Sequence, residues 1–376
     1  MKVTFDTAVL SAHIKSFKPN NKCIDILTSI KMDVENGVVY FTTTDLDVFV
    51  ESETRCTSDG DGVICLPYAE VSVFLKNSKA TQFTIDAPVR VFTGEKDEKG
   101  EAISILPPAI INGVFSIRQN DDDFPIHPEW TALRSMLFSG ALLHEMKAAG
   151  KYVGKDELRP VMSGVCITNK YAMYDVFSTD AHKLFQSSLG MRTEDDKEDF
   201  ELIVKYAPVI TATAAAFKQM NEDVVVSWDN RYIQMRGTGW CVTSRLEDGR
   251  YPNVPAAIPK DNPIHITIDV AALNNAIKQV IPANTTTSRV EFTFNKYEAI
   301  LECSDEDLGT SMKATIPCTY NEEEPFRIGF HGKLMLSILE SVLESSVTLE
   351  MSAPNRAAVM HSKHRLMLLM PVILNN

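Results

Sequence analysis

The sequence predicts an α+β protein built from three copies of one module, each with two helices and several strands. Helix-like segments of two kinds alternate along the chain, β-branched segments lie between them, and a Thr/Ser-Asp pair recurs at similar spacing. The length of 376 residues and the mass of 41.9 kDa exceed one ordinary core and favour two or three domains. A mean hydropathy of -0.08 is typical of a globular protein.

The first kind of helical segment begins at a capping residue, Asp6, Ser139 or Asp269, and continues with apolar residues at i, i+3 and i+4. A segment of the second kind follows each of these after a strand-rich stretch. Each module therefore holds one helix of each kind. The six predicted helical segments are residues 6–18, 68–79, 140–155, 205–220, 269–279 and 330–344.

The stretches between the helices alternate apolar and polar residues, which predicts strands bounded by polar turns. Their Thr/Ser-Asp pairs are Thr44-Asp45, Thr179-Asp180 and Ser304-Asp305, at spacings of 135 and 125 residues. Segments rich in proline and turn residues at 121–130 and 248–263 predict the boundaries between modules. The predicted domains are therefore 1–124, 125–256 and 257–376.

Several classes of protein do not fit the sequence. Its longest apolar run, 366–374, is too short to span a membrane, and its start lacks the apolar region of a signal peptide, so we expect a cytoplasmic protein without a membrane partner. The cysteines are odd in number and form no C-x-x-C pair, which predicts reduced thiols. These cysteines are Cys23, Cys56, Cys65, Cys166, Cys241, Cys303 and Cys318.

No motif predicts catalysis. The turn before Lys333 resembles a phosphate loop, but its glycines enclose two residues instead of four and no Ser or Thr follows the lysine. His361 and His364 lack a third ligand, so a surface loop explains them better than a metal site. The acidic run 121–123 has no calcium-loop spacing and fits an acidic linker. We therefore expect no enzyme activity, no cofactor and no metal.

The charge is unevenly distributed. The net charge of -13 and pI of about 5.1 would ordinarily argue against nucleic-acid binding. The six predicted helical segments nevertheless sum to +5, so the remainder of the chain carries -18. From charge alone, solvated helix faces are the simpler interpretation, and a basic surface for nucleic acid is the alternative.

Two stretches resemble a known family. Residues 158–190 (LRPVMSGVCITNKYAMYDVFSTDAHKLFQSSLG) and 240–259 (WCVTSRLEDGRYPNVPAAIP) resemble the central motifs of the bacterial sliding clamp, the beta subunit of DNA polymerase III. The family patterns there are R-x-x-L-N-G with A-T-D-G-H-R-L, and F-x-S-[KR]-L-x-D-G-[RK]-[FY]-P. Weaker similarities lie near Asp45, Phe124 and Phe326 and in the C-terminal LMLLMPVIL.

The resemblance implies three similar domains per chain, each with two helices packed on antiparallel sheets, and a head-to-tail homodimer that closes into a ring. Such a clamp encircles double-stranded DNA without reading its sequence and tethers the replicative DNA polymerase, after a clamp loader has opened it. The resemblance implies that lysines on the helices line the hole. For each of these lysines, an ordinary surface position is the alternative interpretation. The candidates are Lys15, Lys18, Lys22, Lys76, Lys79, Lys147, Lys151, Lys155, Lys218, Lys278 and Lys333.

The resemblance also implies a hydrophobic pocket for the peptide tails of partners. Leu184 and Met370 fit the protein core equally well. Ala181 stands where the family usually has Gly, Lys183 where it has Arg, and Ala256 where a basic residue is common, a drift that would fit a divergent or phage-encoded clamp. The matching positions are Met162, Thr179, Ala181, His182, Lys183, Leu184, Pro252, Ala257, Leu368, Leu369, Met370, Pro371 and Val372.

Two alternatives remain open. One is a protein-interaction scaffold with the same repeated fold that does not bind DNA. The other is an enzyme whose site carries no motif considered above.

Overall fold

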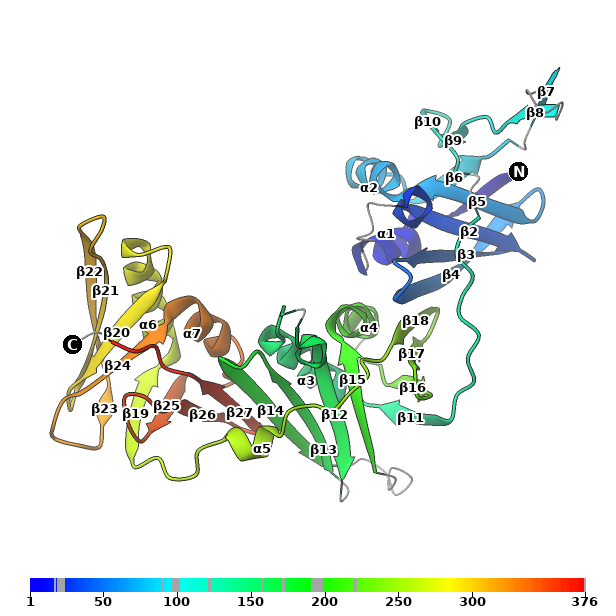
Figure 1. Ribbon diagram of the computed structural model, residues 1–376. Helices are drawn as coiled ribbons and strands as arrows, with labels where there is room; N and C mark the ends of the chain where they lie inside the picture. The colour runs from blue at the N-terminus through cyan, green and yellow to red at the C-terminus, as the bar shows by residue number, and fades with distance from the viewer. Residues whose placement is uncertain are drawn as a thin grey trace. The chain divides into compact units, whose positions relative to one another are not determined.

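The order of strands and helices repeats three times along the chain (Figure 1). This computed structural model describes residues 1–16, 18, 24–88, 91–96, 102–120, 123–156, 158–170, 173–190, 199–218 and 222–374. In each set a strand leads into a helix, four or five strands and a second helix follow, and further strands complete the set. The predicted α+β class and threefold repeat are confirmed.

The first set contains β1 (Lys2–Asp6), α1 (Thr7–Ser16), β2 (Ser29–Glu35), β3 (Val38–Thr44), β4 (Val48–Ser58), β5 (Gly62–Pro67), α2 (Tyr68–Asn77), β6 (Gln82–Asp86), β7 (Val91–Lys96), β8 (Ala102–Ile105), β9 (Ala109–Ile111) and β10 (Phe115–Ile117). The second contains β11 (Arg134–Phe138), α3 (Gly140–Ala149), β12 (Gly164–Lys170), β13 (Met173–Thr179), β14 (Lys183–Gly190), β15 (Phe200–Lys205), α4 (Tyr206–Lys218), β16 (Val224–Trp228), β17 (Tyr232–Gly237) and β18 (Trp240–Arg245). After the short helix α5 (Val254–Ala257), the third contains β19 (Ile264–Asp269), α6 (Val270–Val280), β20 (Arg289–Phe294), β21 (Glu298–Asp305), β22 (Thr310–Pro317), β23 (Thr319–Tyr320), β24 (Phe326–His331), α7 (Gly332–Leu339), β25 (Ser346–Met351), β26 (Ala358–Ser362) and β27 (Arg365–Leu369).

Each of the six predicted helical segments contains a helix, and the predicted caps are confirmed. Asp6, Ser139 and Asp269 accept hydrogen bonds from backbone N–H groups in the first turn of α1, α3 and α6, at 2.6, 3.2 and 2.8 Å. A side-chain oxygen at this position satisfies an N–H group that has no partner within the helix. The caps therefore fix where these three helices begin.

Helix α3 is shorter than predicted. It ends at Ala149, Lys151 lies in a 3-10 turn, and Lys155 lies beyond that turn, so the prediction that Lys147, Lys151 and Lys155 share one helix is wrong. The chain turns at Gly150, where an added Cβ would lie 1.6 Å from the Tyr206 ring. Only glycine allows this close approach.

The chain forms two compact units. Unit 1 comprises Met1–Leu143 and Ala207–Leu246, and unit 2 comprises His144–Tyr206 and Glu247–Asn376. Unit 1 holds a 12-stranded sheet, and unit 2 holds a nine-stranded and a four-stranded sheet. The strand ladders are antiparallel throughout the described sheets.

Strand pairing crosses both predicted domain boundaries. In unit 1, β4 pairs with β18, and in unit 2, β14 pairs with β27. We call these two pairings the first and the second junction. Because each joins strands of two successive sets, the second set is divided between the units, and the predicted boundaries near 124 and 256 stay predictions.

Each unit buries its own apolar core. In unit 1, Phe5 packs between Phe41 and Phe83, with ring centroids 5.2 and 5.4 Å apart. In unit 2, Phe292 packs on Phe330 at 5.6 Å. Aromatic pairs at these distances stabilise beyond the area that they bury.

Candidate functional site

The first motif of the resemblance forms the tight turn between β13 and β14. The Thr179 hydroxyl donates to the Lys183 carbonyl at 2.8 Å and accepts from the Ala181 N–H at 3.1 Å. Asp180 accepts from the backbone N–H groups of His182 and Lys183 at 2.9 and 2.8 Å. Short side chains that bond their own backbone hold such turns. The Thr-Asp pair is therefore a structural element of the turn.

The same turn recurs in the first set. Thr44 accepts from the Leu46 N–H at 2.9 Å, and Asp45 accepts from the Val48 N–H at 2.9 Å. Leu46 and Ala181 occupy the same turn position with φ of 79° and 72°. This left-handed region favours glycine, so the Gly-to-Ala departure at position 181 places a side chain in a strained backbone conformation.

Tyr251 joins the second motif to the first. Its hydroxyl accepts from the Thr179 N–H at 3.1 Å and donates to the Gly164 carbonyl at 3.4 Å. Burial raises the pKa of this phenol, so it stays neutral and keeps its proton for the second bond. The two stretches, about 70 residues apart in the sequence, thus form one structural feature of the second junction.

An apolar cluster surrounds this feature. Leu184, Tyr251, Val254, Val359 and Leu368 are buried in it. Half-buried apolar side chains pack against them and form its outer layer; these are Val161, Ile258 and Leu366. We call this group the apolar junction cluster.

The predicted pocket residues divide by exposure. The Met370 N–H donates to the His182 carbonyl at 2.8 Å, so the C-terminal segment lies beside the β13–β14 turn. Met370 is 42% exposed, whereas Leu184 is 4% exposed. Six predicted residues are buried: Met162, Thr179, Lys183, Leu184, Leu368 and Leu369. The exposed or half-buried ones are Ala181, His182, Pro252, Ala257, Met370, Pro371 and Val372. The surface that a partner can reach is therefore narrower than the predicted set.

Lys183 is held inside unit 2. Its ammonium donates to the carbonyl of Lys151 and to the Ser337 hydroxyl at 3.3 Å, and it lies 5.3 Å from the centre of the Tyr152 ring. Burial lowers the pKa of this lysine, and Asp180 opposes that shift. These contacts give Lys183 a structural role beneath the turn.

A buried ion pair lies at the same junction. Arg365 donates to both carboxylate oxygens of Glu145, at 2.7 and 2.8 Å, and to the Ser341 carbonyl at 2.8 Å. Both charged side chains are 4% exposed. Such bidentate pairs combine charge with fixed geometry. The pair therefore attaches helix α3 to strand β27.

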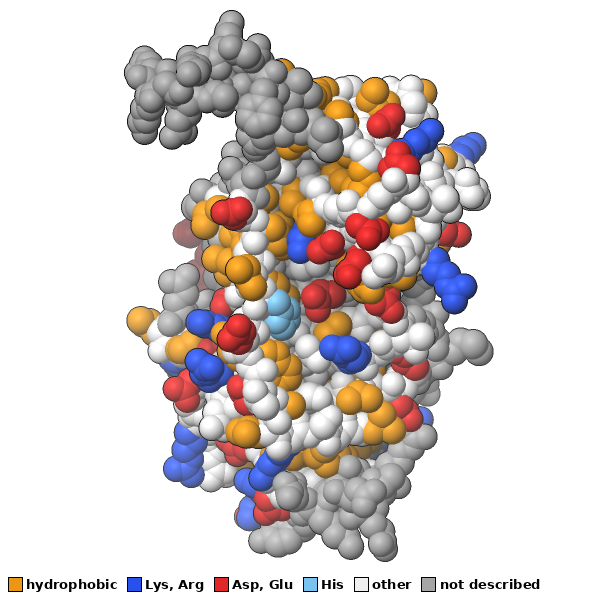
Figure 2. All heavy atoms as spheres, turned by 90° about the vertical axis from the view of Figure 1, so that its right-hand side faces the viewer, with side chains coloured by type: hydrophobic (Ala, Val, Ile, Leu, Met, Phe, Trp, Pro, Cys, Tyr) orange, Lys and Arg blue, Asp and Glu red, His pale blue; other side chains and the backbone are white. Residues whose placement is uncertain are grey.

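Most of the predicted DNA-contacting lysines are exposed. Lys151 forms an ion pair with Glu340 at 2.8 Å, and Lys333 donates to the Thr285 carbonyl at 3.1 Å. Lys218 ends helix α4, and Lys22 lies outside the described residues. The exposed lysines are Lys15, Lys18, Lys76, Lys79, Lys147, Lys151, Lys155, Lys278 and Lys333. On the face shown in Figure 2, acidic side chains gather near the middle and most Lys and Arg side chains lie farther out.

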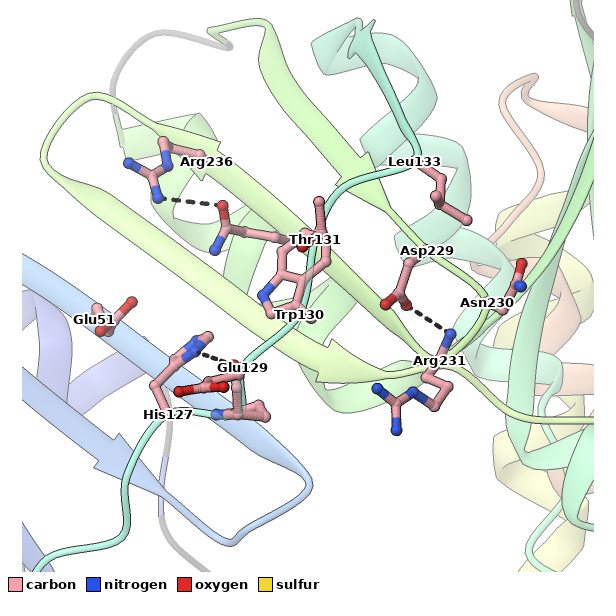
Figure 3. Close-up of a pocket in the computed structure, with 12 residues that line it drawn as sticks. Glu51, His127, Glu129, Trp130, Thr131, Leu133, Asp229, Asn230, Arg231 and Arg236 are labelled. Atoms are coloured by element: carbon pink, nitrogen blue, oxygen red, sulfur yellow. Dashed lines mark hydrogen bonds between the residues drawn. The ribbon is translucent and has the colours of Figure 1, made fainter.

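A polar hollow lies at the first junction. Residues 127–133 and the hairpin between β16 and β17 line an open hollow of about 920 Å³, with Trp130 beside the strand that carries Arg236 (Figure 3). At the first junction the rings of His127 and Phe49 pack with centroids 5.1 Å apart. The corresponding positions of the second junction hold Val254 and Leu184, which both belong to the apolar junction cluster. At this pair of positions the first junction is therefore more polar than the second.

The two histidines considered as metal ligands lie beside different carboxylates. His361 lies 3.7 Å from Glu350, and His364 lies 3.2 Å from Glu145, so the two histidines contact different partners. Within the described ranges, no group of three or more His, Cys, Asp or Glu side chains could hold a metal ion. Among these residues no helix is long and apolar enough to cross a membrane. The described cysteines are free thiols.

Two family models match the chain between residues 146 and 370. The model of the DNA polymerase III beta subunit, central domain, matches residues 146–253, and that of the C-terminal domain matches 256–370. The chain belongs to the DNA polymerase III beta subunit family. The two matches together cover more than half of the chain and confirm the resemblance to the sliding clamp family.

Relatives in this family match between about half and nearly all of the chain. The chain is 23% identical to the beta sliding clamp of Chlamydia pneumoniae over 368 residues, 96% of this chain and 95% of that protein. A shorter match, 22% identical, covers 63% of the beta sliding clamp of Micrococcus luteus. The fold is that of the DNA polymerase III beta subunit of Thermotoga maritima, with a TM-score of 0.84, 17% identity and full coverage of both chains. A Bartonella birtlesii sliding clamp bound to griselimycin also has a TM-score of 0.84, with 18% identity and full coverage of both chains.

Sequence reasoning missed several residues of the second junction. The family motif contained Tyr251, but the motif alone did not predict that its hydroxyl bonds the Thr179 backbone. Val161, Ile258 and Leu366 were also absent from the predicted pocket. The only signal for these residues in the sequence was that they are apolar and lie next to positions that match the family. Contacts between distant segments leave no periodic pattern in a single sequence.

Proposed function

We propose that the chain is a non-enzymatic, cytoplasmic DNA sliding clamp. Two copies close head to tail around double-stranded DNA and tether the replicative DNA polymerase, and a clamp loader opens the ring. Residues 1–124, 125–256 and 257–376 act as its three domains. The observation that carries the proposal is the repeated edge-to-edge pairing of successive sets.

The pairing follows a rule that leaves two edges open. The fourth strand of the first set, β4, pairs with the last strand of the second, β18, and the fourth strand of the second set, β14, pairs with the last of the third, β27. By this rule β22 would pair with a strand equivalent to β10, and each of these two has one neighbour among the described strands. A second copy supplies the missing partner twice and closes the assembly, which removes both free edges.

The exposed lysines support contact with DNA. Lys15, Lys147 and Lys278 lie on the first helix of each set. Lysines bind phosphates without reading bases, so contact is weak, salt-sensitive and independent of sequence. Retention on DNA then depends on encirclement, which allows the clamp to slide.

The second junction is the better candidate for capturing partner peptides. Its apolar junction cluster offers half-buried Val161, Ile258 and Leu366 near exposed Met370, whereas the first junction presents charged and polar groups in its hollow. Burial of a few apolar anchors at about 25 cal/mol per Å² is enough for a micromolar contact.

Two measurements test the proposal. Light scattering during gel filtration should give twice the chain mass of 41.9 kDa. With a clamp loader and ATP, the protein should remain on nicked circular DNA in high salt and leave the same DNA after it is cut once. A monomer, or equal loss from circular and linear DNA, contradicts the clamp. A stable dimer that never remains on circular DNA favours the scaffold without DNA binding.

A further inference from the structure

A second, apolar hollow lies within unit 1, between helices α1 and α4 and the paired strands of the first junction. Its volume is about 590 Å³. Small side chains from both helices and the Trp240 ring form much of its lining. The lining side chains used below are Ala8, Ser11, Ala12, Ala214, Ala215 and Trp240.

The strand registers identify the corresponding place in unit 2. Ser52 of β4 lies opposite Trp240 at the first junction, and Ser187 of β14 lies opposite Arg365 at the second. The helices agree with this correspondence. Ala12 is the sixth residue of α1, and Glu145 is the sixth residue of α3.

The corresponding place at the second junction is filled. Glu145 and Arg365 occupy it, and Arg365 also donates to the carbonyl of Ser341. Ser341 is the tenth residue counted from the start of α7, just as Ala215 is the tenth counted from the start of α4. At the first junction the same positions carry two alanines and a tryptophan. The hollow therefore lies where Ala12 replaces the glutamate of a buried ion pair, while Trp240 stands in the position of its arginine.

The lining selects an uncharged ligand. Both ring nitrogens of His13 are already engaged, with the hydroxyls of Ser52 at 2.8 Å and Thr43 at 3.1 Å. Burial lowers the pKa of His13 to about 3, so its ring stays neutral near neutral pH. The charged side chains in the lining are Lys15, Glu51 and Glu53. Lys15 and Glu53 are exposed, and Glu51 is half-buried.

The size and the aromatic wall narrow the ligand class further. A volume of about 590 Å³ lies within the range of sites for small molecules. The indole of Trp240 is 9% exposed and is oriented by a hydrogen bond from Nε1 to Glu222 at 3.2 Å. A fixed indole favours a flat aromatic partner at stacking distance.

We propose that this apolar hollow binds an uncharged aromatic molecule of small-molecule size, wedged between α1, α4 and Trp240. The ligand takes the place that Glu145 fills at the second junction, beside Trp240, which stands in the position of Arg365. Its binding stabilises unit 1, because a ligand that binds the folded state alone shifts the unfolding equilibrium. The site lies in unit 1 and shares Lys15 with the surface proposed for DNA, whereas the residues proposed for partner peptides belong to unit 2.

The test uses 5-fluoroindole and fluorine NMR. The probe signal should broaden with the wild-type protein, and an excess of unlabelled indole should restore it. Ala12→Phe and Ala215→Phe each fill the hollow, so each should weaken probe binding at least tenfold and raise the melting temperature. Ala271→Phe adds the same side chain at an exposed position of α6 and should leave both quantities unchanged.

Three outcomes overturn the proposal. The first is a probe signal that does not broaden with the wild-type protein. The second is equal broadening with the filled variants and with Ala271→Phe, which places the probe elsewhere. The third is a lower melting temperature for both filled variants, which means that the hollow has no room for an aromatic ring. Retention on circular DNA is measured separately, so failure here leaves the clamp proposal untouched.

Discussion

The buried ion pair between Glu145 and Arg365 allows a quantitative prediction. Arg365→Met keeps an unbranched side chain but removes the guanidinium, leaving the Glu145 carboxylate buried at 4% exposure. His364 at 3.2 Å and His144 at 3.7 Å are then the nearest side-chain partners of its carboxylate. Breaking a buried pair in this way costs about 3 to 5 kcal/mol, and the nearby imidazoles favour the lower end. We therefore expect the free energy of unfolding to fall by about 3 kcal/mol.

The variant should also reverse the pH dependence of stability. In the wild type, burial alone would raise the pKa of Glu145, but the hydrogen bonds and charge of Arg365 outweigh burial and lower it. A lowered carboxyl pKa stabilises the protein above the unfolded pKa, and this stabilisation is lost as pH falls through the folded pKa. Without Arg365, burial dominates and raises the pKa. The variant should then lose stability as pH rises from about 4 to 7.

Urea unfolding at a series of pH values measures both effects. Arg356→Met is the matched control, because Arg356 is exposed in the same unit and its loss should cost less than about 0.5 kcal/mol. Glu145→Leu combined with Arg365→Met should recover much of the lost stability, because no buried charge remains. A loss below about 1 kcal/mol in the single variant, with the wild-type pH slope retained, would refute the reasoning.

Three further predictions concern the turn, the peptide surface and the lysines. Ala181→Gly should stabilise the protein by about 1 kcal/mol in urea unfolding, because φ of 72° strains alanine; an unchanged midpoint argues against strain. Met370→Ala should weaken binding of a polymerase tail peptide about tenfold in calorimetry without changing the melting temperature, and unaltered affinity removes Met370 from the peptide surface. Changing Lys147, Lys151 and Lys155 together to Glu should impair loading or sliding and shorten retention on circular DNA with the dimer mass intact; unchanged processivity contradicts their role.

The sequence was sufficient for the elements whose signals are local. Capping residues such as Asp6 and Asp269 predicted where helices begin, and the structure confirms their hydrogen bonds. The recurring Thr-Asp pairs predicted the repeat, because each pair holds its own turn through contacts within four residues. Helix ends were predicted less well. Helix α3 stops at Ala149 because Gly150 packs on the distant Tyr206 ring.

The candidate site was predicted in part. Matching the family motifs indicated the second junction, but only the folded structure shows which residues of that junction are exposed. Lys183 was predicted in the pocket, and its ammonium instead bonds Lys151 and Ser337 inside unit 2. Tyr251 contributes through one hydroxyl that reaches the backbone of a strand far away in the sequence. A linear pattern does not record such contacts.

The amino-acid order alone determined the class of fold, the threefold repeat and the family, because propensities, caps and motifs act over a few neighbouring residues. Tertiary structure decided which strands join successive sets, which motif residues remain accessible, and why one junction encloses a hollow where the other buries Glu145 and Arg365. These features depend on which side chains from separate segments meet. Their energies come from burial and pairing, which exist only after the chain has folded.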